Sequence, residues 1–374
     1  MRRLQKDYIL RDLENNKMAI IVGPRQVGKT WLAREISKSF NHPVYLNYDS
    51  LTDRRHIKSE DWLSETDLLI FDEIHKMKHW KNYLKGIFDT KPEHQRIIVT
   101  GSARLDAFRR GGDSMAGRFF VHYLLPFSIR ELSNTPFADQ LSRLINRGGF
   151  PEPFLADDDA FPARWRNQYK DGLIREDILD FEAIHQLRTM EILLETLRER
   201  VGSPLSYKSL AEDLEVSPNT VKKYVRILES LFIVFLVHPY ATNIARSILK
   251  EPKLYFFDTG MVKGDTGIRF ENMVALALLK HVTALADYRG ESAGLHYLRT
   301  KDGREVDFCL VRNNKVEQII ECKLTSTKLD RNLVYFADRY NLPAVQLVHS
   351  LRTGHQSGAI EILPALKYLN DLYL

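Results

Sequence analysis

A short glycine-containing stretch near the start of the chain, MAIIVGPRQVGKTWLAREI, constrains the fold more than any other feature. Its apolar run from Met18 to Val22 predicts a buried strand, and the residues after Thr30 have the pattern of a helix. Between them, the spacing G-x-x-x-x-G-K-T from Gly23 to Thr30 is that of a phosphate-binding loop. The order strand, loop, helix therefore predicts an α/β domain with a mostly parallel sheet.

The residue types in this loop predict how a nucleoside triphosphate is held. Glycines let successive backbone N–H groups turn toward phosphate oxygens, and the N-terminus of the following helix favours the same negative charge. We expect Lys29 to reach the β- and γ-phosphates and the Thr30 hydroxyl to bind Mg²⁺. The predicted ATP-binding residues of the loop are Gly23, Pro24, Arg25, Gln26, Val27, Gly28, Lys29 and Thr30.

A second motif, TDLLIFDEIHK, supplies acidic residues. The apolar run from Leu68 to Phe71 predicts a buried parallel strand that ends in Asp72 and Glu73. Acids at the carboxyl end of such a strand lie where open α/β sheets bind ligands. We expect Asp72 to hold Mg²⁺ through its water shell and Glu73 to orient or deprotonate the attacking water. We interpret His75 as a surface or packing residue.

Two further segments offer candidate residues. RIIVTGSA predicts a third strand whose polar end presents Thr100 and Ser102 to the γ-phosphate or the water, unless it is an ordinary polar strand end. SMAGRFFVHYLLP places Arg118 just before another apolar strand, from Phe119 to Leu125. An arginine there either stabilises transition-state charge in a neighbouring subunit or has a structural role.

The segment SPLSYKSLAEDLEVSPNTVKKYVRILESLFIVFLVHPY predicts a helix-turn-helix followed by an apolar wing. Ser217 is the expected N-cap of the second helix, with proline at its first position. Lys222, Lys223 and Arg226 lie away from the apolar stripe of that helix. A basic second helix of this kind contacts DNA in the major groove, and a packing role is the alternative.

Near the end of the chain, REVDFCLVRNNKVEQIIECKLTS predicts a hairpin whose turn contains Asn313 and Asn314. A two-residue loop there would pair Asp307 with Ile320, which puts Asp307 and Glu321 on opposite faces. A loop one residue longer would pair Asp307 directly with Glu321. Two adjacent carboxylates repel each other unless a cation lies between them, so loop length separates a metal site from a plain hairpin.

Other charged residues extend this second candidate site. Lys323 shares a strand face with Glu321. Glu271 lies on the apolar face of a predicted helix, RFENMVALALLKHV, where it either caps the first turn or points into a site. With the same longer loop, Glu305 would face Lys323 across the sheet and could pair with it, which would leave no free lysine.

Composition limits the remaining alternatives. A chain of 374 residues predicts two or three domains, and a net charge of +5 permits a nucleic-acid partner without requiring one. Cys309 and Cys322 lie in apolar runs and match no zinc spacing, so we expect reduced core residues. The first residues lack the apolar stretch of a signal peptide, and no uncharged run approaches a membrane span. A cytoplasmic location with no membrane partner is expected.

The GPRQVGKT loop, the DEIHK strand and the TGS and AGR segments together resemble the AAA+ ATPases. More narrowly, they resemble a prokaryotic group, and this match continues through LLPFSIREL and GGFPEP over nearly the whole chain. The resemblance implies ATP hydrolysis with ATP and Mg²⁺, in which Lys29, Glu73 and Arg118 are catalytic. It also implies a homo-oligomer or a protein partner, whereas the C-terminal region of that group is defined mainly by its unknown function.

Glu271, Asp307 and the Glu321-x-Lys323 pair resemble the centre of the PD-(D/E)xK nucleases. That resemblance implies that the three acids hold Mg²⁺ and that Lys323 helps to position or activate water. Such folds are also reused without activity. Two functions therefore stay open: an ATPase that moves a nuclease-like module on DNA, and an ATP-dependent switch whose C-terminal region binds a protein and cuts nothing.

We expect four domains. They are a P-loop AAA+-like ATPase core (residues 1–133), a helical lid (134–200), a winged helix-turn-helix (201–240) and an α/β restriction-endonuclease-like domain (241–374).

Overall fold

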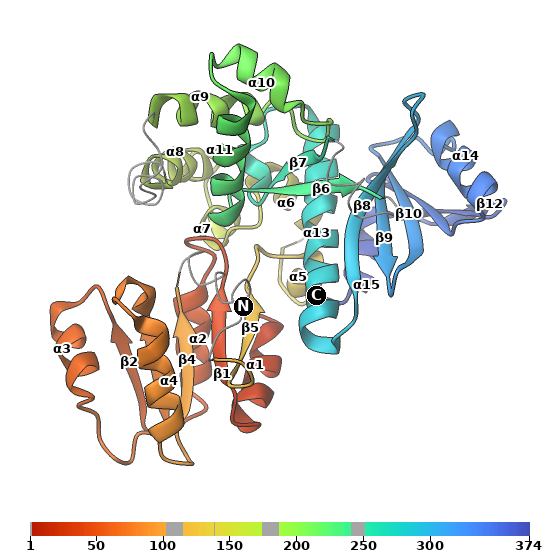
Figure 1. The fold of residues 1–374 in the computed structure, drawn as a ribbon. Helices are drawn as coiled ribbons and strands as arrows, with labels where there is room; N and C mark the ends of the chain where they lie inside the picture. Colours follow the sequence, from red (N-terminus) through yellow and green to blue (C-terminus); the bar gives the residue numbers. More distant parts are fainter. Residues whose placement is uncertain (1, 102–114, 138, 174–186, 241–250) are drawn as a thin grey trace. The chain divides into compact units, whose positions relative to one another are not determined.

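The computed structural model describes residues 2–101, 115–137, 139–173, 187–240 and 251–374 (Figure 1). The chain forms two compact units. The first contains Met1–Leu125 with Ser230–Phe232, and the second contains Pro126–Glu229 with Ile233–Leu374. The candidate Ser102 lies outside the described residues.

The first unit is built on a five-stranded, fully parallel sheet in the order β2-β3-β4-β1-β5. This arrangement confirms the predicted α/β class with a parallel sheet. The strand between the loop strand β1 and the acid strand β3 is β4. The strands are β1 (Met18–Val22), β2 (Pro43–Asn47), β3 (Leu68–Asp72), β4 (Arg96–Thr100) and β5 (Phe119–Tyr123).

Helices follow the strands in alternation, because parallel strands need crossover connections. One face of the sheet packs against helices α3 and α4 through a buried cluster that includes Ile20, Phe71 and Ile57. Every residue of β1 and β3 is buried, which explains why these strands read as uninterrupted apolar runs. The helices are α1 (Gln5–Glu14), α2 (Lys29–Ser37), α3 (Leu51–Ser59), the 3₁₀ turn η1 (Ile74–Lys76) and α4 (Trp80–Thr90).

The second unit contains a mixed eight-stranded sheet in the order β12-β13-β11-β10-β9-β8-β6-β7. The strand that we expected to form a wing is β6, which instead lies inside this sheet between β8 and β7. The predicted domain boundary after residue 240 therefore falls between two neighbouring strands. The strands are β6 (Val234–Pro239), β7 (Lys253–Phe256), β8 (Ala293–Arg299), β9 (Glu305–Arg312), β10 (Lys315–Lys323), β11 (Ala344–Val348), β12 (His355–Ser357) and β13 (Ile360–Pro364).

The helices of the second unit vary widely in length, and none in the described ranges is long and apolar enough to cross a membrane. The segment around GGFPEPF is helical, with proline at the first position of α7. The helices are α5 (Ile129–Leu132), α6 (Gln140–Arg147), α7 (Pro151–Leu155), α8 (Phe161–Gly172), α9 (Leu187–Leu197), α10 (Tyr207–Asp213), α11 (Pro218–Ser230), η4 (Thr259–Met261), α13 (Thr266–Arg289), α14 (Arg331–Tyr340) and α15 (Ala365–Asp371).

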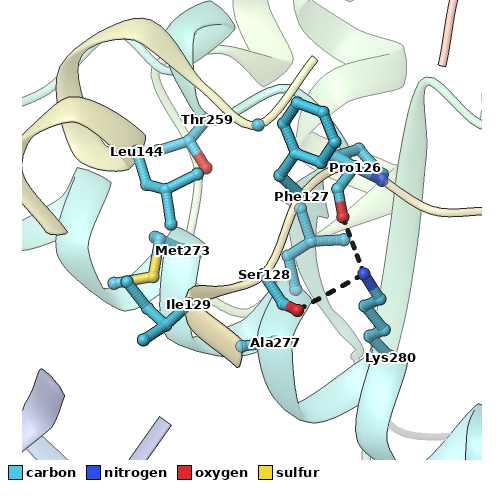
Figure 2. Close-up of a pocket in the computed structure, with 11 residues that line it drawn as sticks. Pro126, Phe127, Ser128, Ile129, Leu144, Thr259, Met273, Ala277 and Lys280 are labelled. Atoms are coloured by element: carbon cyan, nitrogen blue, oxygen red, sulfur yellow. Dashed lines mark hydrogen bonds between the residues drawn. The ribbon is translucent and has the colours of Figure 1, made fainter. Parts of the chain in front are cut away.

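The long helix α13 holds the first residues of the second unit in place (Figure 2). The amino group of Lys280 donates to the carbonyl of Pro126 (3.2 Å) and lies 3.4 Å from the Ser128 hydroxyl. It also pairs with the carboxylate of Glu131, which caps α5 by accepting from the Ser128 N–H (3.2 Å). A small cavity lined by Phe127, Ser128 and Lys280 remains beside this buried ion pair.

Candidate functional site

The loop after β1 closes tightly against the residue that follows the neighbouring strand β5. At Gly23, φ is +150°, and a Cβ atom there would lie 2.1 Å from the carbonyl oxygen of Leu124. Gln26 (φ +60°) and Gly28 (φ +99°) are also left-handed, which turns the intervening N–H groups toward one side. Successive N–H groups in such a turn form a concave site for an anion.

Lys29, the first residue of α2, directs its amino group into this loop. Its amino group donates to the carbonyl oxygens of Gly23 (3.0 Å) and Pro24 (2.7 Å). The side chain is buried even though it is a lysine. A phosphate held by the loop N–H groups would therefore meet a positive charge that is already in place.

Three hydroxyl groups converge on Asp72 at the end of β3. Thr30 Oγ1 donates to Oδ2 (2.9 Å), Thr100 Oγ1 donates to Oδ1 (2.6 Å), and Tyr45 Oη donates to Oδ2 (2.6 Å). Asp72 is only 5% exposed. Because Thr30, Asp72 and Thr100 come from three neighbouring elements, the predicted grouping of the loop, the acid strand and β4 is observed.

The oxygen ligands around Asp72 suit Mg²⁺. The cation prefers hydroxyl, carboxylate and water oxygens in octahedral geometry, and it usually keeps several waters. Thr30 and Asp72 would hold the ion here, because the Thr30 hydroxyl and the Asp72 carboxylate are already in contact. Sequence reasoning missed Tyr45, because a tyrosine in the short strand β2 has no motif around it. Burial and the hydrogen bond to Asp72 raise the pKa of the Tyr45 hydroxyl, so it stays a donor.

Glu73 follows Asp72 in a strained conformation. Its φ is +55°, and its N–H donates to the carbonyl of Thr100 (3.0 Å). Burial, and then the charge of Asp72, raise the pKa of the Glu73 carboxyl. His75 Nε2 lies 3.6 Å from Glu73 Oε2, and its side chain is buried, so this histidine is a direct neighbour of the acid. Non-glycine residues with positive φ cluster at functional sites.

Arg118 lies at the amino end of the strands, whereas the phosphate loop lies at their carboxyl end. It precedes the amino end of β5, which pairs in parallel with β1 from Met18↔Phe119 onward. The loop follows the carboxyl end of β1, so roughly 15 Å of strand separates them. Arg118 forms a two-pronged ion pair with Asp89 of α4 (2.7 and 3.0 Å). The structure does not bring Arg118 together with its own phosphate loop.

The C-terminal hairpin combines features of both predicted loops. Asn313 and Asn314 have φ of +50° and +62°, and the first pair beyond this two-residue turn is Lys315↔Arg312. A β-bulge between Val316 and Gln318 then adds a residue to β10 and shifts the register.

Beyond the bulge, Ile319 pairs with Cys309 and Ile320 with Phe308. One further step places Glu321 beside Asp307, which is the register expected for the longer loop. The Asp307 N–H donates to Glu321 Oε2 (3.3 Å), and the Cys322 N–H donates to Asp307 Oδ2 (3.0 Å). At this point, main-chain N–H groups therefore donate to side-chain carboxylates in place of the carbonyl oxygens of the facing strand.

The predicted acids of this centre do come together. Burial, and then the charge of Asp307, raise the pKa of Glu321 to about 8 and that of Glu271 to about 7. Glu271 Oε1 also accepts a hydrogen bond from the hydroxyl of Tyr255 (2.7 Å). Glu271 is therefore a member of the site and not a cap of the first turn of α13.

A lysine lies among the carboxylates of this centre. It is Lys253, the first residue of β7. Its amino group lies 2.8 Å from Glu305 Oε1, 3.4 Å from Asp307 Oδ1 and 3.6 Å from Glu271 Oε1. Burial alone would lower the pKa of Lys253, but these carboxylates outweigh it and raise the pKa. Sequence reasoning missed Lys253, because a lysine at the start of an apolar run resembles a solvent-exposed strand end.

Lys323 does not pair with Glu305, the alternative considered above. Its amino group lies 2.8 Å from Glu321 Oε1 and 3.0 Å from Asp330 Oδ2. The alternative ion pair between Glu305 and Lys323 is not formed, since Glu305 instead contacts Lys253 and Arg299 (2.9 Å). Within the described ranges, no group of three or more His, Cys, Asp or Glu side chains has an arrangement that could hold a metal ion.

Helix α11 has the expected two faces. Val221, Val225 and Leu228 are buried, and the hydroxyl of Ser217 accepts from the Thr220 N–H (3.1 Å) at the helix start. Glu215 in the preceding turn has φ of +53°. The basic residues Lys222, Lys223 and Arg226 are exposed on the other face.

The strand order and the loop define the class of the first unit as a P-loop nucleotide-binding domain. Residues 15–133 match the family model of an AAA domain. Residues 138–271 and 266–368 match two family models described as Domain of unknown function (DUF8612) and Domain of unknown function (DUF4143). The chain thus combines an AAA-type P-loop domain, which implies nucleotide binding, with two domains of unknown function.

Similar curated proteins extend over most of the chain. An uncharacterized protein of Mycobacterium tuberculosis is 26% identical over 328 residues, covering 85% of this chain and 72% of its own length. An uncharacterized protein of Methanocaldococcus jannaschii is 26% identical over 371 residues, covering 87% and 80%. An uncharacterized protein of Haemophilus influenzae is 23% identical over 366 residues, covering 86% of each.

Solved structures with lower similarity include ATPases. The Walker-type ATPase of Pyrococcus abyssi has a TM-score of 0.43 and 13% identity, covering 72% of this chain and 95% of that one. The RuvB Holliday junction branch migration motor of Thermotoga maritima has a TM-score of 0.31 and 19% identity, covering 62% and 87%.

Proposed function

We propose that this chain hydrolyses ATP in its first unit. The observation that carries the proposal is the convergence of Thr30, Thr100 and Tyr45 on Asp72, beside a loop that already contains the charge of Lys29. This arrangement supports the binding of a triphosphate together with a hydrated Mg²⁺, which would neutralise charge on the β- and γ-phosphates.

Glu73 is the proposed residue that orients or deprotonates the attacking water. Its raised pKa makes the carboxylate a better proton acceptor than an ordinary glutamate. The bond from its N–H to Thr100 fixes the backbone beside Asp72. Lys29 and the loop N–H groups hold the phosphates, so that binding and water activation belong to different side chains.

Two substitutions test this proposal. Lys29→Ala should abolish nucleotide binding and turnover, whereas Glu73→Gln should lower turnover by on the order of a hundredfold and preserve binding. ATP turnover and nucleotide affinity are measured for both variants. Lys38→Ala, at an exposed lysine just after the same helix, is the matched control and should behave as wild type. Full turnover in either site variant would contradict the assignment.

We also propose that the second unit contacts DNA through α11. The supporting observation is that Lys222, Lys223 and Arg226 share the exposed face of a capped helix that follows a tight turn. Phosphate neutralisation by such residues gives a binding constant that falls with salt concentration.

Charge reversal of these three residues tests the DNA contact. Replacement of all three by glutamate should weaken the binding of a duplex and reduce the slope of log K against log salt by about 0.9 for each phosphate that is no longer neutralised. Lys208→Glu, at an exposed residue of α10, is the control. Unchanged affinity and slope would assign α11 to packing.

For the carboxylate centre of the second unit, the grouping of Glu271, Asp307, Glu321 and Lys323 supports nuclease chemistry, whereas Lys253 opposes it. We propose the inactive alternative, in which this region serves as a protein-interaction module of an ATP-dependent switch. Incubation of the full chain with Mg²⁺ or Mn²⁺ and with branched, linear and single-stranded DNA tests it. Cleavage that disappears in Asp307→Ala would restore the nuclease function.

A further inference from the structure

A buried amine lies at the point where three carboxylates meet. Lys253 is 1% exposed, and its amino group contacts Glu305, Asp307 and Glu271. These residues come from β7, β9 and α13, so the contacts form only in the folded unit. A lysine is rarely buried this completely unless it is paired.

The oxygen atoms of Asp307 and Glu321 are already engaged. Asp307 directs Oδ1 to Lys253 and accepts the Cys322 N–H at Oδ2. Glu321 directs Oε1 to Lys323 and accepts the Asp307 N–H at Oε2. A divalent cation would have to replace these partners.

Glu271 is similarly constrained. Its Oε1 accepts from the Tyr255 hydroxyl and faces Lys253. Gly202 lies so close that a Cβ atom at that residue would be 2.9 Å from Oε1 and 3.2 Å from Oε2. Mg²⁺ demands oxygen ligands at about 2.0–2.1 Å with near-octahedral order. The residues present therefore do not fit a divalent metal while Lys253 is in place.

We propose that Lys253 is a covalently tethered cation that takes the place of a divalent metal in this centre. Its ammonium group supplies the positive charge that Glu271, Glu305 and Asp307 require, and it holds β7, β9 and α13 together. The wild-type centre accordingly excludes Mg²⁺ and Mn²⁺, and loss of the lysine opens a cation site. This inference concerns the second unit and is independent of ATP hydrolysis in the first.

Mn²⁺ binding to the nucleotide-free full chain tests the proposal, with the Asp72→Asn substitution present throughout to remove the phosphate-loop metal ligand. Electron paramagnetic resonance measures free Mn²⁺ in titrations. In protein that retains Lys253, Mn²⁺ uptake should be the same with and without the Asp307→Asn substitution. Uptake that disappears on adding Asp307→Asn would overturn the proposal, and this measurement needs no change at Lys253.

The Lys253→Met variant provides the opposite test. Removal of the amine leaves the acids without their cation, so the variant should gain a Mn²⁺ site and its melting temperature should rise on Mn²⁺ addition. Adding Asp307→Asn should abolish both gains. Lys301→Met, at an exposed lysine in the β8–β9 turn, is the control and should gain nothing. A folded Lys253→Met protein, verified by circular dichroism, that gains no Mn²⁺ would also overturn the proposal.

Discussion

A single methyl group at residue 23 would collide with the backbone just after the neighbouring strand β5. The added Cβ of Gly23→Ala would lie 2.1 Å from the Leu124 carbonyl oxygen, at a φ that side chains rarely adopt. Because a backbone atom cannot move aside cheaply, the loop must shift away from its phosphate-binding shape. We expect loss of ATP affinity together with a lower melting temperature, measured by calorimetric titration and thermal unfolding.

A glycine in the same unit provides the control. Gly86 lies inside α4, and a Cβ added there would meet no atom within 4 Å. Gly86→Ala should therefore leave ATP affinity unchanged and stabilise the helix by about 0.5–1 kcal/mol. Equal ATP affinity in the two variants would show that the contact at Gly23 does not shape the loop.

Side chains differ in how far their positions follow from the sequence. The positions of Thr30, Asp72 and Thr100 were predictable. Asp72 and Thr100 end apolar strands, and Thr30 follows such a strand at the fixed spacing of the phosphate loop, so all three lie near the carboxyl ends of the strands. Tyr45 and Lys253 were not, because both act across pairings distant in sequence. Tyr45 reaches Asp72 only through β2–β3 pairing, and Lys253 reaches Asp307 only through the three-dimensional arrangement of β7 and β9.

At the scale of elements, the hairpin of β9 and β10 shows why register was uncertain. The two-residue turn at the asparagine pair belonged to one of the two alternatives, and the pairing of Asp307 with Glu321 belonged to the other. Counting residues outward from the turn allowed either the two-residue turn or the pairing of Asp307 with Glu321, but not both. The count failed because nothing in the segment KVEQII marks the extra residue of the bulge. Bulges depend on packing of the two faces more than on local residue type.

The buried ion pair between α13 and α5 carries a stability prediction. Lys280 and Glu131 are both buried, so removal of one partner leaves a charge without its counterion. Lys280→Met should destabilise the second unit by about 3–5 kcal/mol. Urea unfolding followed by circular dichroism measures this change.

A double variant separates charge from packing at this ion pair. Lys280→Met combined with Glu131→Gln removes both charges and should recover part of the stability, because a buried neutral pair costs less than one buried ion. Lys315→Met, at an exposed lysine of β10, is the matched single control. A decrease in stability at Lys280 no larger than at Lys315 would contradict the role of this ion pair.

At the scale of the whole molecule, Arg118 raises the question of assembly. It lies too far from its own loop to reach a bound phosphate, and its pairing with Asp89 is at the surface, where ion pairs exchange at little cost. We propose that Arg118 acts on a neighbouring subunit. Arg118→Ala should then lower turnover by at least roughly tenfold at unchanged ATP affinity.

Mixing the two variants with reduced turnover distinguishes action between subunits from action within one. Arg118→Ala retains an intact Glu73, and Glu73→Gln retains an intact Arg118, so mixed assemblies contain complete sites and should regain ATP turnover. Asp89→Asn, which removes only the partner of Arg118, should keep turnover close to wild type. Wild-type turnover of Arg118→Ala alone would refute the role of this arginine.

The overall architecture was partly predictable. Alternating strands and helices with a phosphate loop correctly indicated a parallel sheet for the first unit. The second sheet was harder, because β6, β7 and β8 join it from positions on both sides of the long helix α13. Local patterns predict each strand but not its neighbours, and the restriction-endonuclease-like fold of residues 241–374 stays a prediction.

The bulge in β10 also determines how this centre responds to the loss or gain of one residue. Deletion of Glu317 alone would remove the bulge, but Glu321 would still pair with Asp307, because the shortened strand then follows the simple register of a two-residue hairpin. Glu321 would stay beside Asp307 on the same face of the sheet, so the centre would survive this deletion. One added residue between the bulge and Glu321 would instead bring Ile320 opposite Asp307 and turn Glu321 to the other face of the sheet, so the centre tolerates a shorter β10 but not a longer one.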